Sequence, residues 1–237
     1  MIPKVIHYCW FGGKSLPRSA CKCLESWAKN CPDYEIKRWD ESNFDVRQHP
    51  FVASAYDAEA WAFVSDWARL KILYDNGGIY LDTDVELLKP LDELLTNQFY
   101  IGVQQSGQLC TTGLGFGCAK ASPVVQEMLA QYDGLIFERA RSKELACPYF
   151  NDEVVRSHGF TGNGLGEVER LDGLTVYPSR FFDPIAPGCS QNLLCDDTFS
   201  VSLYANSWGS NWAKLRRSLI NAIGYERVER LKKIVGR

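Results

Sequence analysis

The sequence predicts an α/β fold in which helices flank a mixed central sheet. Short apolar segments with strand-like patterns alternate with longer segments in which apolar residues recur at helical spacing. No internal repeat interrupts this alternation, and the chain of 237 residues is long enough for a sizeable core. Hydrophobic residues make up 46% of the chain and charged residues 23%, which are globular values and exclude disordered and collagen-like chains.

The N-terminal part of the chain is expected to hold three strands and two helices. Residues 34–39 alternate as in a half-exposed strand and residues 4–10 read as a buried strand, whereas apolar residues in the helix segments recur every three or four positions. An Asn-Gly-Gly sequence stops the longer helix. The expected elements are a strand at 4–10, a helix at 19–30, a strand at 34–39, a helix from about 57 to 74, and a short strand at 79–82.

Regular elements are expected to be sparser in the second half of the chain. Strands are predicted at 99–104 and 114–118, and a helix capped by Ser122 at 122–132. The segment 143–195 is rich in Gly, Pro and aromatic residues, which predicts a loop-rich lid or a wall on the acceptor side of a site. Within it, Asn151-Asp152-Glu153 is expected to begin a helix rather than to supply a catalytic carboxylate.

Charge is distributed unevenly along the chain. The net charge is −3, but residues 213–237 hold eight basic and two acidic residues, so this segment carries +6 and residues 1–212 carry −9. An acidic body argues against a nucleic-acid partner. No apolar run approaches the roughly 18 residues that span a bilayer, and the first residues lack the apolar region of a signal peptide. Nine unevenly spaced cysteines favour a reducing compartment, so we expect a cytoplasmic protein.

Asp82 and Asp84 form the most informative local pattern. At positions i and i+2 of an extended chain, both carboxylates point to one side. They follow a predicted strand, where sites of α/β sheets usually lie. Two oxygen ligands suit Mg²⁺ or Mn²⁺, which typically also binds substrate phosphates. Alone, such a pair has an equally good interpretation as a solvated turn after a strand.

A second polar pair lies in the preceding helix. Asp66 and Arg69 are three residues apart and so share a helix face, where an ordinary ion pair would be worth only tenths of a kcal/mol. A charged pair is unusual in a helix that is otherwise so apolar. The Asn-Gly-Gly stop folds this helix back beside the next strand, which predicts that Asp66, Arg69, Asp82 and Asp84 meet in one cleft.

Residues 61–84 resemble the core of the DXD-containing sugar transferases, a family that includes capsular polysaccharide synthesis enzymes and Och1-like mannosyltransferases. The catalytic domains of clostridial glucosylating toxins are more distant members. The opening segment 2–13 is similar to the start of the bacterial capsular branch, and segments 112–117 and 177–184 are similar to later blocks of it. The resemblance spans about residues 2–212.

The resemblance implies a GT-A nucleotide-diphosphosugar transferase domain at 1–212, followed by a basic amphipathic tail at 213–237. It also implies a UDP-sugar donor, a Mn²⁺ or Mg²⁺ ion and retention at the anomeric carbon. Transferred by position, the donor-binding roles are Trp10 stacking on uracil, Asp66 and Arg69 holding sugar hydroxyls, Tyr80 lining the donor pocket and Thr111 contacting the donor. Asp82 would hold ribose, sugar and metal, and Asp84 would hold the metal directly. Ser207 and Trp208 would reach the β-phosphate.

The sequence departs from the family pattern at a predicted metal ligand. Where the family has a His pair, this chain has Ser202 and Leu203, and a hydroxyl is a poorer ligand than imidazole. Thr111 replaces an expected Asn, and Asn163 an expected Pro after Thr-Gly. Asn206 or water would take the place of the His ligand, or the chain is a weak or inactive sugar-nucleotide-binding relative.

The predicted function is therefore the transfer of a hexose from a UDP-sugar to a saccharide or lipid-linked saccharide acceptor in bacterial surface polysaccharide synthesis. A two-carboxylate glycoside hydrolase is disfavoured, because such enzymes set their carboxylates across a sugar ring rather than on one side of one strand. The basic tail is expected either to pack on the body as a solvated helix or to contact an anionic membrane surface peripherally.

Overall fold

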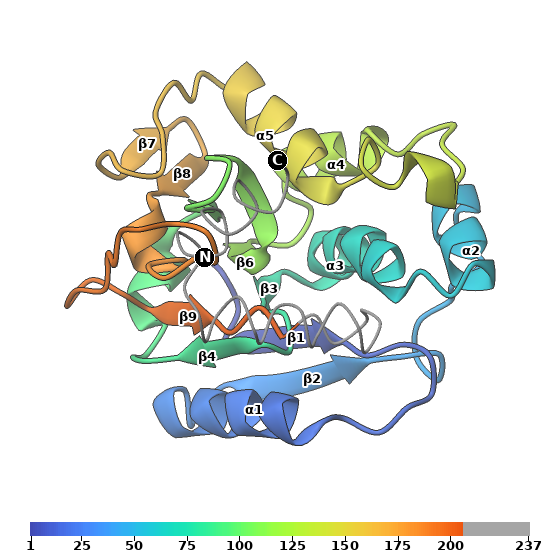
Figure 1. Ribbon diagram of the computed structural model, residues 1–237, viewed down its shortest axis with the longest axis horizontal. Coiled ribbons are helices and arrows are strands. Elements are labelled where there is room, and N and C mark those ends of the chain that lie inside the picture. Colours follow the sequence, from blue (N-terminus) through green and yellow to red (C-terminus); the bar gives the residue numbers. More distant parts are fainter. Residues whose placement is uncertain (206–237) are drawn as a thin grey trace, which may run out of the picture.

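The computed structural model describes residues 1–205 and is built on a seven-stranded mixed sheet (Figure 1). Residues 206–237, which include Ser207, Trp208 and the basic tail, lie outside the described part of the chain. In the order in which they lie across the sheet, the strands are β2 (Glu35–Trp39), β1 (Val5–Cys9), β3 (Gly78–Tyr80), β6 (Cys110–Cys118), β5 (Phe99–Val103), β8 (Leu174–Tyr177) and β7 (Glu169–Leu171).

A small antiparallel sheet and eight helices complete the described chain. The small sheet pairs β4 (Val85–Leu87) with β9 (Ser200–Ser202). The α-helices are α1 (Arg18–Asn30), α2 (Pro50–Asp57), α3 (Trp61–Asn76), α4 (Pro123–Ala130) and α5 (Cys147–Ser157), and the short 3-10 helices are η1 (Asp92–Thr96), η2 (Arg139–Arg141) and η3 (Ser179–Phe181). No helix of the described residues is long and apolar enough to cross a membrane.

The direction of the strands changes at the middle of the large sheet. β1 runs parallel to β2 and to β3, whereas β3 is antiparallel to β6. The mixed sheet predicted from the sequence is therefore confirmed. Because the chain leaves β1 and β3 at the same edge, the residues that follow them are brought together there, as in other α/β sheets.

Two apolar layers cover the two faces of the sheet. One contains α2, α3, α4 and α5, and the other contains α1, the small sheet and the aromatic residues of 177–199 (Figure 1). Trp27 of α1 is completely buried in the second layer, and its indole N–H donates to the Val85 carbonyl at 2.7 Å. The sheet thus holds α3 on one side and β4 on the other.

The turn between α3 and β3 depends on two glycines. Gly77 and Gly78 have φ of +69° and +106°, which side-chain-bearing residues rarely adopt. A Cβ on Gly77 would lie 2.8 Å from the Lys120 amide nitrogen, and one on Gly78 would lie 2.8 Å from His7 Nε2. The predicted helix stop is confirmed, and close packing on both sides fixes the path of the chain toward Asp82.

Two expected boundaries in this region are wrong. The helix predicted from about 57 to 74 begins only at Trp61, because the chain turns at Glu59 with φ of +51°, and α2 before this turn was not predicted. The strand predicted at 79–82 ends at Tyr80, and Asp82 begins a turn in which the Val85 amide donates to its carbonyl at 3.0 Å. The Asp pair therefore lies in a turn rather than on the strand.

The expected loop-rich segment 143–195 holds more structure than its composition predicted. It contains α5, β7 and β8, and Asn151-Asp152-Glu153 lies inside α5 rather than at its start. Asp152 there accepts a hydrogen bond from the Cys110 amide at 3.1 Å, so it ties α5 to the sheet. Ser122 precedes α4 as expected but makes no side-chain capping bond.

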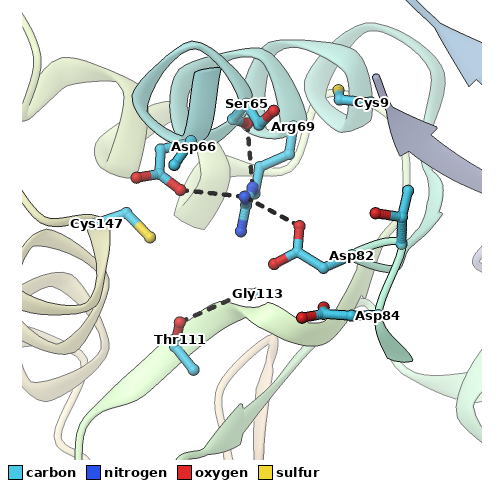
Figure 2. Close-up of a pocket in the computed structure, with 11 residues that line it drawn as sticks. Cys9, Ser65, Asp66, Arg69, Asp82, Asp84, Thr111, Gly113 and Cys147 are labelled. Atoms are coloured by element: carbon cyan, nitrogen blue, oxygen red, sulfur yellow. Dashed lines mark hydrogen bonds and ion pairs between the residues drawn. The ribbon is translucent and has the colours of Figure 1, made fainter. Parts of the chain in front are cut away.

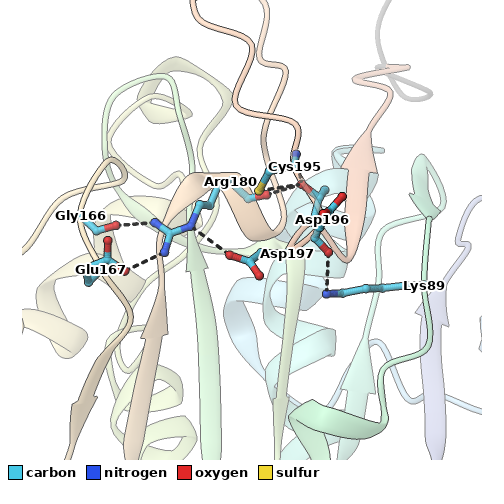
Figure 3. A network of polar contacts seen from close by, with 8 residues as sticks. Lys89, Gly166, Glu167, Arg180, Cys195, Asp196 and Asp197 are labelled. Carbon is cyan, nitrogen blue, oxygen red and sulfur yellow. Dashed lines mark hydrogen bonds and ion pairs between the residues drawn. The ribbon is translucent and has the colours of Figure 1, made fainter.

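Arg180, which follows β8, connects the loop before β7 to the loop before β9 (Figure 3). Its guanidinium donates to the Gly166 carbonyl at 2.6 Å and to Glu167 at 2.8 Å, and lies 3.7 Å from Asp197. Nearby, the Lys89 ammonium donates to the Asp196 carbonyl at 3.1 Å. These contacts hold surface loops to each other and to the chain after β4.

Candidate active site

A cavity of about 210 Å³ opens at the edge of the sheet where β1 and β3 end (Figure 2). Its walls come from α3, the turn after β3, strand β6 and the start of α5. The described residues that line it are Cys9, Ala62, Ser65, Asp66, Arg69, Asp82, Thr83, Asp84, Thr111, Gly113 and Cys147. The predicted meeting of Asp66, Arg69, Asp82 and Asp84 in one cleft is confirmed.

Arg69 is the central charge of the cavity. Its side chain is only 4% exposed, and Nη2 lies 3.1 Å from both Asp66 Oδ1 and Asp82 Oδ1. The Nε–H donates to the Ser65 carbonyl at 3.1 Å, and the guanidinium lies 4.8 Å from the centre of the Tyr80 ring. A planar guanidinium held by this many partners has a fixed orientation. The Asp66–Arg69 pair is thus more than a surface ion pair, because Arg69 also contacts Asp82 and so connects α3 to the turn after β3.

Asp82 is held on one side and open on the other. Oδ1 accepts from the Tyr80 hydroxyl at 3.2 Å and from Arg69. Removal from water raises the pKa of this carboxyl to about 7, with a smaller contribution from the negative charge of Asp84 and against the opposing charge of Arg69. The site therefore carries more negative charge than Arg69 alone compensates, a surrounding that favours a bound cation.

Asp84 is fixed by the end of the described chain. The Ala205 N–H donates to Asp84 Oδ2 at 2.9 Å, and the Leu203 N–H donates to the Asp84 carbonyl at 2.8 Å. Both contacts follow from the pairing of β4 with β9, in which Val85 lies opposite Ser202. A segment more than a hundred residues away thus sets the position of this carboxylate.

The sequence analysis missed the small residues that other elements contribute to the cavity. Cys147, at the start of α5, hydrogen-bonds to Asp66 through its backbone and its thiol, and burial raises the pKa of that thiol well above its usual value. Cys9 lines the cavity at the end of β1. A Cβ on Gly113 would lie 2.8 Å from Asp82 Oδ2, so only glycine leaves this space open. No spacing rule marks such residues, because strands and helices far apart in sequence bring them together.

The donor atoms fit a divalent cation that shares its coordination with a substrate. Among the described residues, no group of three or more His, Cys, Asp or Glu side chains is arranged to hold a metal ion. Asp82 and Asp84 nevertheless line the same cavity, and Mg²⁺ is commonly held by one or two carboxylates together with substrate phosphates. Ser202 is not among the described lining residues, and its Oγ accepts from the Tyr204 amide at 3.4 Å.

The other predicted donor-binding residues occupy different places. Thr111 lines the cavity, and its Oγ1 accepts from the Gly113 amide at 3.3 Å. Tyr80 is not among the described lining residues, because its ring packs beneath Arg69 and only its hydroxyl reaches Asp82. Trp10 is also buried, and its indole N–H donates to the Lys14 carbonyl at 2.7 Å. Stacking of Trp10 on a base stays a prediction.

Comparison with known proteins decides the family. The model of glycosyltransferase sugar-binding regions containing a DXD motif matches residues 17–100. An uncharacterized glycosyltransferase of Acanthamoeba polyphaga mimivirus, L373, is 33% identical over 226 residues, which cover 88% of this chain and 84% of that protein. The chain belongs to the DXD-containing glycosyltransferase family. The enzyme class expected from the sequence, a glycosyltransferase, is thus confirmed.

Two further similarities concern parts of the chain. Inositol phosphoceramide mannosyltransferase 3 of Schizosaccharomyces pombe is 32% identical over 132 residues, which cover 54% of this chain and 36% of that protein. The chain therefore spans about a third of that relative's length. The solved structure of PaToxG glycosyltransferase matches with a TM-score of 0.54 at 19% identity, over 66% of this chain and 69% of that one. This likeness concerns the fold alone and, with the mixed sheet, confirms the predicted GT-A type.

Proposed function

We propose that this glycosyltransferase is metal-dependent and moves a hexose from a UDP-sugar to a saccharide acceptor with retention at the anomeric carbon. The observation that carries the proposal is the convergence of Asp66, Arg69, Asp82 and Asp84 in one cavity. Each of these side chains has its orientation fixed by a hydrogen bond or ion pair to another part of the chain. Groups fixed in this way need little reorganisation when charge develops on a substrate.

Different residues of the cavity would bind different parts of the donor. Asp82 and Asp84 would hold Mn²⁺ or Mg²⁺, which supplies charge neutralisation for a diphosphate leaving group. Asp66 and Arg69 would bind hydroxyls of the sugar, since they line the cavity from α3, across from β6 (Figure 2). Thr111 would contact the donor from β6, with Gly113 leaving space for it.

The transfer step we propose needs no enzyme nucleophile. The acceptor oxygen forms the new bond to the anomeric carbon on the face from which the diphosphate oxygen departs. The bond between that carbon and the diphosphate oxygen breaks, and the acceptor proton goes to the departing diphosphate. The role of the protein is to orient both partners and to keep the charge of the leaving group compensated.

The identity of the donor sugar and of its nucleotide base is the most specific part of the proposal. The resemblance of segments 2–13 and 61–84 favours UDP-hexoses. The Schizosaccharomyces pombe relative is named as a mannosyltransferase, which makes a mannosyl donor the second candidate. A screen of UDP-glucose, UDP-galactose, their N-acetyl forms and GDP-mannose distinguishes the two.

The acceptor and location are proposed from the sequence. We propose that the acceptor is an oligosaccharide or lipid-linked saccharide of a bacterial surface polysaccharide. A protein that contacts the membrane peripherally through residues 213–237 would reach it from the cytoplasm. Eight basic residues in that segment favour an anionic surface. Co-sedimentation with vesicles containing anionic lipid, with and without residues 213–237, tests the contact. Equal pelleting of both proteins would contradict it.

Release of nucleoside diphosphate from the donor panel, with Mn²⁺ or with a chelator, tests the proposed activity. We expect turnover that requires the metal and falls at least a hundredfold in Asp84→Asn. Glu86→Gln is the matched control, because this carboxylate lies two residues further on and is exposed on β4. Binding of nucleotide without turnover by the wild type would instead support the alternative, an inactive sugar-nucleotide-binding relative that lacks the His pair.

A further inference from the structure

Asp183 is a completely buried carboxylate that lies outside the cavity. Both of its oxygens lie 2.7 Å from the Tyr204 hydroxyl, and Oδ2 also accepts from the Gln105 amide at 2.8 Å. A buried carboxylate is costly unless it is hydrogen-bonded, and bonds to a charged acceptor are stronger than those between neutral groups. Asp183 is therefore a firm anchor for the Tyr204 side chain.

Tyr204 links this anchor to the Asp-rich turn. Its backbone has φ of +47°, a left-handed conformation that is unusual for a bulky residue and that turns the chain sharply. On either side of it, the Leu203 N–H donates to the Asp84 carbonyl at 2.8 Å and the Ala205 N–H donates to Asp84 Oδ2 at 2.9 Å. The backbone around Tyr204 thus wraps Asp84.

We propose that Asp183 and Tyr204 are positioning residues that set the orientation of the Asp84 carboxylate. Asp183 holds the Tyr204 ring, the held ring keeps the backbone in its left-handed turn, and the turn aims the Ala205 N–H at Asp84. Neither Asp183 nor Tyr204 is among the described residues that line the cavity. This role rests on the proposed function and deepens it, because it explains how Asp84 is held ready for a cation.

If the hydrogen bond between Asp183 and Tyr204 were only structural, removing it would lower the melting temperature without changing the Mn²⁺ dependence of donor turnover. The positioning role instead predicts that Tyr204→Phe and Asp183→Asn each raise the Mn²⁺ concentration for half-maximal donor turnover about tenfold, the usual effect of losing a bond to a charged group. The kcat at saturating Mn²⁺ should stay within about twofold, because the cation then orders the carboxylate itself. The double variant should show the same tenfold shift, since both changes remove one contact.

Tyr177→Phe is the matched control. Its hydroxyl, like that of Tyr204, lies in a partly buried hydrogen bond and accepts from Asn97 Nδ2 at 3.3 Å, but Tyr177 lies on β8. We expect the control to change the melting temperature as much as Tyr204→Phe does and to leave the Mn²⁺ dependence unchanged. Unchanged Mn²⁺ dependence in both Tyr204→Phe and Asp183→Asn would overturn the positioning role.

Amide exchange followed by NMR separates failure of this role from failure of the proposed function. In the full chain without donor, the Ala205 amide should be protected, and Tyr204→Phe should accelerate its exchange at least tenfold while the β6 amides stay unchanged. Equal exchange at Ala205 in the two proteins would overturn the positioning role even in an active enzyme. Accelerated exchange in a protein that binds no nucleotide would support the positioning of Asp84 and count against the proposed function.

Discussion

Arg69 and Arg180 each contact two carboxylates, but they lie in very different surroundings. Arg69 is 4% exposed and contacts Asp66 and Asp82, which are themselves partly or mostly covered. Arg180 contacts Glu167 and Asp197, whose side chains are 89% and 60% exposed (Figures 2 and 3). Similar contact geometry therefore serves two purposes. Water screens the Arg180 ion pairs, which only hold surface loops together. The Arg69 ion pairs lie in a poorly solvated cavity, where electrostatic interactions are stronger.

The largest expected effect comes from breaking the buried network. Arg69→Gln leaves Asp66 and Asp82 in the cavity without their cation, so the free energy of unfolding should fall by about 3 kcal/mol or more. Donor turnover should fall below detection. Urea unfolding measures the first and nucleotide release the second. A loss of stability under 1 kcal/mol would show that the cavity is as well solvated as the surface around Arg180.

His7 extends the comparison to a buried neutral group. It accepts from the Trp39 indole at 3.0 Å through Nδ1, which places its proton on Nε2, where it donates to the Gly77 carbonyl at 3.0 Å. Burial lowers the pKa of His7 to about 4. As the pH falls, His7 therefore becomes protonated in the unfolded chain before it does in the folded protein.

The stability contributed by neutral His7 should be complete above about pH 6.5 and be lost between pH 6.5 and 4, by up to about 3 kcal/mol. Urea unfolding of the wild type at pH 7 and pH 5 measures this loss together with that from other groups. His7→Gln, which keeps a donor and an acceptor, should show a smaller decrease over the same range. Equal decreases in both proteins would contradict the assignment of a neutral imidazole at this turn.

Gly113 tests whether the cavity must stay open beside Asp82. A Cβ there would lie 2.8 Å from Asp82 Oδ2 and 3.3 Å from Arg69 Nη1, so Gly113→Ala should reduce donor turnover about tenfold or more. At Gly166 an added Cβ would meet only the Asn163 carbonyl oxygen at 3.6 Å, an ordinary contact, so Gly166→Ala is the control. Equal turnover in Gly113→Ala and wild type would place the donor elsewhere.

The smallest effect is expected at the exposed network. Arg180→Gln should lower the free energy of unfolding by about 1 kcal/mol or less, because its two carboxylate partners keep their water. Turnover at saturating donor should remain unchanged. A loss as large as that of Arg69→Gln would remove the contrast between the two arginines.

Much of the fold could be predicted because local patterns determine it. A buried-strand pattern located β1, period-two alternation located β2, and the Asn-Gly-Gly stop located the turn that brings α3 back to β3. α2 was missed because it lies in a stretch that reads as polar, and the start of α5 was placed at Asn151 although the helix begins at Cys147. Tertiary contacts with β6, such as that of Asp152, stabilise α5.

The candidate site was predictable in part for the same reason. Asp66, Arg69, Asp82 and Asp84 lie within one continuous segment, so helix spacing and the turn place them together. Cys147 and Gly113 reach the cavity from distant elements, and no local pattern marks them. The contact of Ala205 with Asp84 depends on the pairing of β9 with β4, which sequence spacing does not determine.

The central claim is that the Asp82–Asp84 turn binds a nucleoside diphosphate through a divalent cation. Titration calorimetry of UDP and of GDP into the wild type and Asp84→Asn, each with Mn²⁺ or with a chelator, tests it most directly. The account predicts binding of one of the two nucleotides to the wild type with Mn²⁺ only. Binding that is equal with the chelator and in Asp84→Asn, or no binding under any of these conditions, would contradict it.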